Sequence, residues 1–185
     1  MIMTNTRFVR SAGLCLIIGA LIGLGSGVIQ ALSPAAPSSP AFNVRNDIVI
    51  LSHLLVLIGV FGFARSGVAG NSWLAKIGLG LALLASFAFI PAEMAIQIRY
   101  ALGEMLLGIC APLQGIGMVL AGIAVLRTGY WQGWPRFIPL LCGLYPFLVL
   151  IPVFAATGGP NFWAIAGAQV PYLLLGLAMR GSVKR

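Results

Sequence analysis

The residues that could do chemistry in this chain are few and lie in apolar surroundings. The stretch PAEMAIQIRYALGEM, residues 91–105, holds two of the three acidic residues, Glu93 and Glu104, with Arg99 between them. The only histidine, His53, lies in another apolar segment. Ionisable groups within a membrane span mark functional sites by default. Glu93, Glu104 and His53 are therefore a candidate proton or cation site.

The same residues are also suited to a structural role. Glu93 and Glu104 flank a predicted tight turn, so either carboxylate can pair with Arg99 or His53 and hold neighbouring helices in register. One histidine and two glutamates would suit a divalent cation, but the HxxxH and ExxH spacings of metal sites are absent. No metal site is predicted, and the structural and ion-handling interpretations both stay open.

Catalytic motifs are not found. Ser26 in GLGSG superficially resembles the serine of an intramembrane protease, but Leu24 stands where that motif needs glycine. Cys15, Cys110 and Cys142 fall in three separate apolar segments without CxxC spacing, as expected of small packing residues. We therefore predict no catalytic residue, no enzyme activity and no cofactor.

Composition indicates where these residues are placed. Of 185 residues, 60% are hydrophobic and 8% are charged, and the mean hydropathy is +1.04, whereas soluble domains carry about 25% charged residues. The net charge of +8 comes from single bases between apolar runs rather than from a basic patch with interleaved aromatic residues. The chain is predicted to be an integral membrane protein in a lipid bilayer, without a nucleic-acid partner.

The elements that must position the candidate site are transmembrane helices. A bilayer core about 30 Å thick needs about 20 apolar residues per helix. The Pro- and Ser-rich stretch at 33–47 is predicted to be an irregular loop outside the bilayer. The sequence thus predicts an all-α, polytopic bundle forming a single domain over 1–185, with six spans at about 12–32, 48–66, 73–97, 101–126, 136–156 and 161–180.

Orientation follows from the positions of the bases. Lys and Arg are enriched in cytoplasmic loops of membrane proteins. A cytoplasmic N-terminus leaves only Arg45 and Arg99 outside and places the other bases inside. The first apolar run, of about 19 residues, is longer than that of a typical signal peptide, so we expect it to remain as a span. Both termini are predicted to be cytoplasmic, and the inside bases are Arg7, Arg10, Arg65, Lys76, Arg127, Arg136, Arg180, Lys184 and Arg185.

With this topology, the polar residues of several spans share one depth. Glu93, Glu104 and His53 lie about one helical turn, roughly 5–6 Å, below the outer boundary. The residues expected to support them at that level are Gln30, Asp47 and Arg99.

Two further polar residues, Gln114 and Gln169, lie near the bilayer centre. Each is expected to form a hydrogen bond with a neighbouring helix. The alternative is a polar line from the outer cluster toward the middle, as in transporters with interrupted helices. The prolines of the fifth span, Pro139, Pro146 and Pro152, are expected to kink it.

Small residues predict where the helices approach one another. Gly19, Gly23 and Gly27 form one face of the first span, and Gly108 and Gly115 lie on one stripe of the fourth. In lipid, such faces allow close helix packing. The partner could be another helix of this chain, a second copy in a homo-oligomer or another membrane protein.

A glycine-rich first span, a Pro-containing outer loop and a second span reading LSHLLVLIGVFGFAR are features shared with a known group. In this layout the chain resembles small multi-span inner-membrane proteins of bacteria that have no established activity. The resemblance implies a bacterial plasma membrane and nothing finer. Two functions remain open: an accessory or structural membrane protein, and a small proton- or cation-coupled carrier or sensor.

Overall fold

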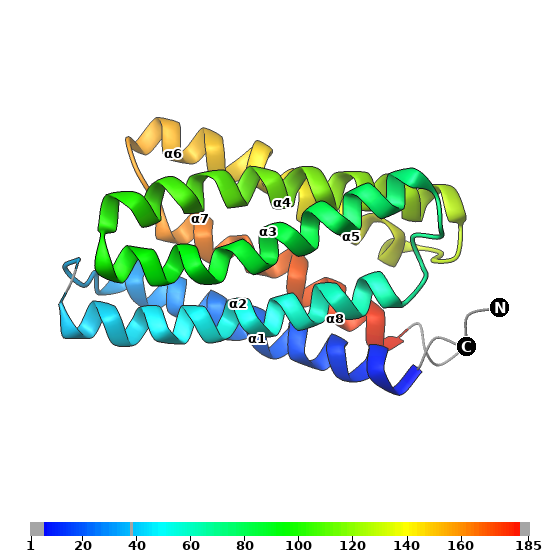
Figure 1. The fold of residues 1–185 in the computed structure, drawn as a ribbon, viewed down its shortest axis with the longest axis horizontal. Helices are drawn as coiled ribbons and strands as arrows, with labels where there is room; N and C mark the ends of the chain where they lie inside the picture. The colour runs from blue at the N-terminus through cyan, green and yellow to red at the C-terminus, as the bar shows by residue number, and fades with distance from the viewer. Residues whose placement is uncertain (1–5, 38, 182–185) are drawn as a thin grey trace.

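The computed structural model describes residues 6–37 and 39–181, and they form helices joined by short connections (Figure 1). Six helical segments are long and apolar enough to cross a membrane, which confirms the predicted all-α, multi-span architecture. The first four are continuous helices and the last two are interrupted. In chain order they are α1 (Thr6–Leu32), α2 (Pro40–Arg65), α3 (Trp73–Ile98), α4 (Tyr100–Thr128), a fifth span (Trp134–Thr157) and a sixth (Phe162–Gly181).

Helix α2 begins earlier than predicted, so the expected loop at 33–47 is wrong for its second half. Ser39 caps the helix, because its hydroxyl accepts a hydrogen bond from the Phe42 N–H at 3.2 Å. Pro40 occupies the first turn, where its missing N–H breaks no helical bond. A serine cap followed by proline is a known helix start, and residues 40–47 continue α2 toward one end of the bundle.

The fifth and sixth spans are each built from shorter helices. The fifth comprises η1 (Trp134–Phe137), α5 (Ile138–Tyr145), a π-helical turn η2 (Pro146–Leu150) and α6 (Ile151–Thr157). Pro146 starts the π-helical turn, in agreement with a helix disturbed by proline. The sixth comprises α7 (Phe162–Gly167) and α8 (Gln169–Gly181).

Successive spans pack against each other, and the sixth span returns to α1 and also contacts the fifth. The most extensive contact is between α3 and α4. A Cβ atom at Gly78 would lie 2.6 Å from the backbone nitrogen of Ala121, and one at Gly117 would lie 2.5 Å from that of Ala82. Only glycine allows this backbone contact, which is typical of helix pairs in membranes.

The glycines of the first span face other helices of the same chain. A Cβ at Gly19 would lie 2.8 Å from Leu55 Cβ in α2, and one at Gly27 would lie 2.9 Å from Ala166 Cβ in α7. Gly23 lies between Ser52 of α2 and Gln169 of α8. The described contacts of this face are therefore intramolecular.

The two glycines singled out in the fourth span differ from one another. Gly115 faces the fifth span, because a Cβ there would lie 2.7 Å from the ring of Phe147. Gly108 is exposed, and no atom of another helix in the described part of the chain lies within 4 Å of its Cβ position. Because α4 turns this part of its stripe outward, packing of Gly108 against a second copy or another membrane protein stays a prediction.

The largest buried apolar side chains lie toward the end of the bundle where α1 begins and α8 ends. They come from four helices, and the buried residues at the opposite end are smaller and more polar. The core of this half includes Leu16, Val60, Phe63, Met118, Val125, Leu175 and Met179.

Candidate functional site: a polar seam between two helices

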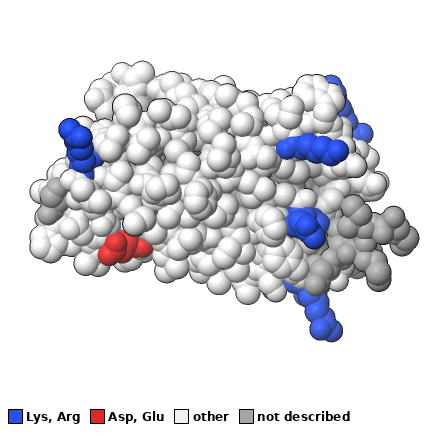
Figure 2. All heavy atoms as spheres, viewed as in Figure 1, with Lys and Arg blue, Asp and Glu red and all other residues white. Residues whose placement is uncertain are grey.

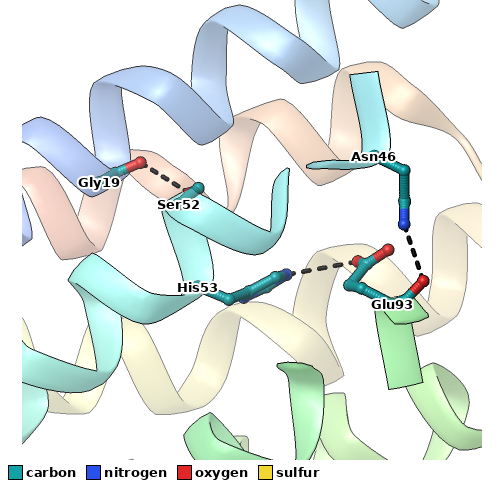
Figure 3. Close-up of polar contacts among 5 residues, drawn as sticks. All are labelled: Gly19, Asn46, Ser52, His53 and Glu93. Carbon is teal, nitrogen blue, oxygen red and sulfur yellow. Dashed lines mark hydrogen bonds and ion pairs between the residues drawn. The ribbon is translucent and has the colours of Figure 1, made fainter. Parts of the chain in front are cut away.

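The predicted polar cluster contains one close ionisable pair. Nε2 of His53 in α2 lies 3.4 Å from Oε1 of Glu93 in α3, and Figure 3 shows the two side chains pointing toward each other. Their side chains are 16% and 10% exposed, respectively. An ionisable side chain within a membrane span is costly to insert. The facing imidazole offsets part of that cost and directs Glu93 toward α2 rather than toward lipid.

An aromatic ring fixes the orientation of the histidine. The imidazole of His53 stacks on Phe89 with ring centroids 4.7 Å apart and planes within 6°. Phe89 and Glu93 are four residues apart in α3, so they lie on the same helical face. One face of α3 therefore holds both the surface on which His53 rests and the carboxylate that it meets.

A second bond joins α2 and α3 nearer to the end of the bundle at which α2 begins. Nδ2 of Asn46 donates a hydrogen bond to the backbone carbonyl of Glu93 at 2.7 Å, and Asn46 is buried (Figure 3). Asn46 and His53 are seven residues apart, which is close to two turns of helix. They therefore present one polar face of α2 to Glu93 from two levels.

The contact continues to the end of α3. Nε2 of Gln97 donates to Oδ1 of Asp47 at 2.8 Å and approaches the carbonyl of Asn43 at 3.4 Å. Glu93 and Gln97 again share one face of α3. We call this set, Asn46, Asp47 and His53 of α2 with Glu93 and Gln97 of α3, the polar seam.

Glu104, the third member of the predicted site, stands apart. Its carboxylate lies beside the hydroxyl of Tyr100 in the same helix, at a half-buried position. Arg99, which separates α3 from α4, is exposed. No group of three His, Cys, Asp or Glu residues able to hold a metal ion occurs among residues 6–37 and 39–181. The structure thus brings together His53 and Glu93, with Asp47 at the far end of the same seam.

Gln30 is connected to the second helix at a different point. Its Oε1 accepts a hydrogen bond from Nη1 of Arg45 at 2.9 Å, and the same guanidinium donates to the carbonyl of Ser33. The sequence indicates only that Arg45 is a base outside the membrane. Its actual contacts tie the end of α1 to the start of α2.

Sequence reasoning missed two small polar residues that bind helices together. The hydroxyl of Ser52 donates to the carbonyl of Gly19 at 2.7 Å and is fully enclosed (Figure 3). Asn46 was likewise not singled out. A recoverable signal was the seven-residue spacing of Asn46 and His53, which places two polar side chains on one face of an apolar helix.

The two central glutamines differ. Nε2 of Gln114 in α4 donates to the hydroxyl of Ser86 in α3 at 3.1 Å, and the Tyr172 hydroxyl of α8 lies beside it. Gln169 lies against Gly23 of α1, but its buried Oε1 has no hydrogen-bond partner among the described residues. Gln114 therefore makes the interhelical bond expected of it, whereas the Gln169 carbonyl oxygen finds no such partner within residues 6–37 and 39–181.

Charge is distributed unevenly along the bundle. The three acidic residues lie at the end bearing the seam, while most bases lie at the opposite end, where α1 begins and α8 ends. Figure 2 shows basic side chains over that second end and acidic atoms near the other. The described bases at the second end, hereafter the basic end, are Arg7, Arg10, Arg65, Lys76, Arg127, Arg136 and Arg180.

Comparisons with protein-family models, with curated proteins and with solved structures found no match. No family is therefore identified, and the resemblance to bacterial inner-membrane proteins stays a resemblance of layout. The six long apolar helices make this chain an integral multi-span membrane protein.

Proposed function

We propose that this protein is an accessory or structural protein of a bacterial plasma membrane, which acts through contacts of its helices with one another and with a membrane partner and catalyses no reaction. The observation that carries this proposal is the pairing within the polar seam. His53 and Glu93 face each other at 3.4 Å, and the Asn46 and Gln97 amides each meet an acceptor on the opposite helix. These polar groups bind α2 to α3.

The uneven charge distribution supports an orientation. Bases are enriched on the cytoplasmic side of membrane proteins. Arg65, Lys76 and Arg127 mark the same end of the bundle as the first and last described residues, Thr6 and Gly181. We propose that this end is cytoplasmic, so that both termini are inside and the seam lies near the outer face.

A second function has one specific observation in its favour. His53 and Glu93 are ionisable groups held together inside candidate membrane spans, and histidine changes its charge close to neutral pH. Such a pair can accept and release a proton. The alternative proposal is therefore a small proton- or cation-coupled carrier or sensor that uses His53 and Glu93, whereas Glu104, the third residue of the predicted site, lies apart from this pair.

The two proposals are separated by measuring flux and stability together. The full-length protein is reconstituted in proteoliposomes, and pH-driven proton and cation flux is compared among wild type, Glu93→Gln and Glu104→Gln. Thermal unfolding of the same three proteins is measured in detergent. Glu104→Gln is the matched control, because Glu104 lies outside the seam while its chemistry is the same.

A structural protein gives no flux above empty liposomes in the wild type and a lower unfolding temperature for Glu93→Gln than for Glu104→Gln. A carrier gives wild-type flux that disappears in a Glu93→Gln protein that still folds. Wild-type flux of that kind would overturn the structural proposal.

A further inference from the structure

An apolar hollow opens on the outside of the bundle, beginning about one helical turn from His53 on the basic-end side of the seam. It is lined by Phe8 of α1, by Leu57, Ile58 and Phe61 of α2, and by Leu83 of α3, and its volume is about 370 Å³. Ile58 and Phe61 are 42% and 45% exposed, so the hollow faces the surroundings of the helices. In a membrane-embedded bundle such a surface meets lipid chains.

Two bases stand at the basic-end edge of this hollow. Arg65 ends α2 one turn beyond Phe61, and Lys76 lies in the first turn of α3. Both side chains are exposed, and the short connection between α2 and α3 keeps them at one end of the bundle. A charged group of opposite sign at the membrane surface would meet both bases.

The path between these bases and the apolar lining is open on the α3 side. Lys76, Gly80 and Leu83 follow each other at spacings of four and three residues, so they lie on one helical face. Gly80 is exposed, and its Cβ position has no neighbouring atom within 4 Å. The absence of a side chain at Gly80 leaves the stripe from Lys76 to Leu83 unobstructed.

We propose that this hollow binds an anionic phospholipid, with one acyl chain against Ile58, Phe61 and Leu83 and the headgroup phosphate beside Arg65 and Lys76. The apolar lining fits a hydrocarbon chain, and the two bases complement a negatively charged headgroup. Basic residues near a membrane surface favour anionic lipids by about fivefold each. The proposal does not rest on the function proposed for the seam.

Native mass spectrometry of the full-length protein tests the proposal. The detergent-solubilised protein is titrated with phosphatidylglycerol or with phosphatidylcholine of identical chains. We expect the first phosphatidylglycerol to bind more tightly than phosphatidylcholine. The double variant Arg65→Gln/Lys76→Gln should lower the affinity for phosphatidylglycerol by about 25-fold, the product of two fivefold losses. The control Arg136→Gln/Arg180→Gln removes two exposed bases from the same end but from the fifth and sixth spans, and should leave the affinity within about twofold.

Two filling variants test the apolar part. Ile58→Trp should lower the affinity for both lipids. Ile116→Trp, at a similarly exposed position of α4, should leave both affinities unchanged. Gly80→Leu fills the stripe from the α3 side and replaces Ile58→Trp if that variant fails to fold. Equal losses of phosphatidylglycerol affinity in both double variants would show only a general attraction to the basic end. Unchanged affinity in the filling variants would show that the hollow does not contribute to lipid binding. Either result would overturn the proposal.

Discussion

The polar seam and the interrupted fifth and sixth spans meet the same requirement of the membrane interior in different ways. In the seam, α2 and α3 are continuous, and polar side chains from both helices bind one another. In the interrupted spans, the Tyr145 hydroxyl donates to the backbone carbonyl of Ala164 at 3.0 Å, next to the π-helical turn that starts at Pro146. The same carbonyl also accepts the Ala168 N–H at 3.1 Å, so this bond gives the Tyr145 hydroxyl a partner in the apolar interior.

The difference lies in what holds each contact in place. His53 and Glu93 are positioned by side-chain pairing and stacking, so substitution should remove a few bonds and leave both helices in place. The hydroxyl of the half-buried Tyr145 lies against Gly167, because a Cβ atom there would overlap it. A change there must move a helix or a ring. The interrupted spans should therefore tolerate substitution less well than the seam.

The largest effect is expected from Gly167→Ala. The added methyl group collides with the Tyr145 hydroxyl, and overpacking typically costs about 1–3 kcal/mol. The displaced hydroxyl also loses its bond to Ala164, worth about 1 kcal/mol more. The free energy of unfolding, measured in mixed micelles with a denaturing detergent, should fall by about 2–4 kcal/mol.

The control for Gly167→Ala is the same change made in a Tyr145→Phe background. Without the hydroxyl, the collision is relieved and the cost of the alanine should fall by more than half. An equal cost in both backgrounds would show that Tyr145 does not limit the space at Gly167, and the proposed contrast between the two regions would fail.

A smaller loss is expected from Asn46→Ala in the seam. The variant removes a buried donor that meets the Glu93 carbonyl at 2.7 Å, and interhelical hydrogen bonds in membrane proteins average about 0.6 kcal/mol. Unfolding free energy should fall by about 1 kcal/mol. Asn71→Ala, which removes an exposed amide from the loop between α2 and α3, should change it by less than about 0.5 kcal/mol. A cost for Asn46→Ala no larger than that of Asn71→Ala would contradict the role given to this bond.

The smallest effect is expected at the exposed end of the seam. Gln97→Ala removes the bond to Asp47, which is accessible at the end of the bundle, where water competes for both groups. The loss should stay below about 0.5 kcal/mol. If Gln97→Ala cost more than Asn46→Ala under the same conditions, the seam would be strongest at its exposed end, contrary to the burial of its members.

Much of the architecture could be predicted because it depends on properties that the sequence displays directly. Apolar length located the six spans, and the glycines of α1 indicated its packing face. Residues 40–47 were missed because their Pro and polar content suggested a loop, although Ser39 and Pro40 form a helix start. Spacing located the stripe that contains Gly108 but could not show which part of it another helix of this chain covers.

The candidate site was predicted in part for a similar reason. Depth along each helix placed His53, Glu93 and Glu104 at one level, and His53 and Glu93 do meet. Depth carries no information on rotation about the helix axis, however, and rotation turns Glu104 toward Tyr100 of its own helix. The stacking of His53 on Phe89 and the bond from Asn46 depend on the crossing of α2 and α3, which sequence periodicity does not encode.

The most direct test of a structural seam is a double-mutant cycle between His53 and Glu93, measured as unfolding free energy in mixed micelles. The single variants His53→Ala and Glu93→Ala are compared with the double variant. The Asn46 side chain bonds to the Glu93 backbone, so this bond is kept in the wild type, the two single variants and the double variant. The stacking on Phe89 is lost whenever His53 is replaced, so its contribution cancels in the coupling energy. A coupling of about 1 kcal/mol or more is predicted. A coupling of zero would mean that His53 and Glu93 do not hold α2 to α3, and would contradict the structural role proposed for the polar seam.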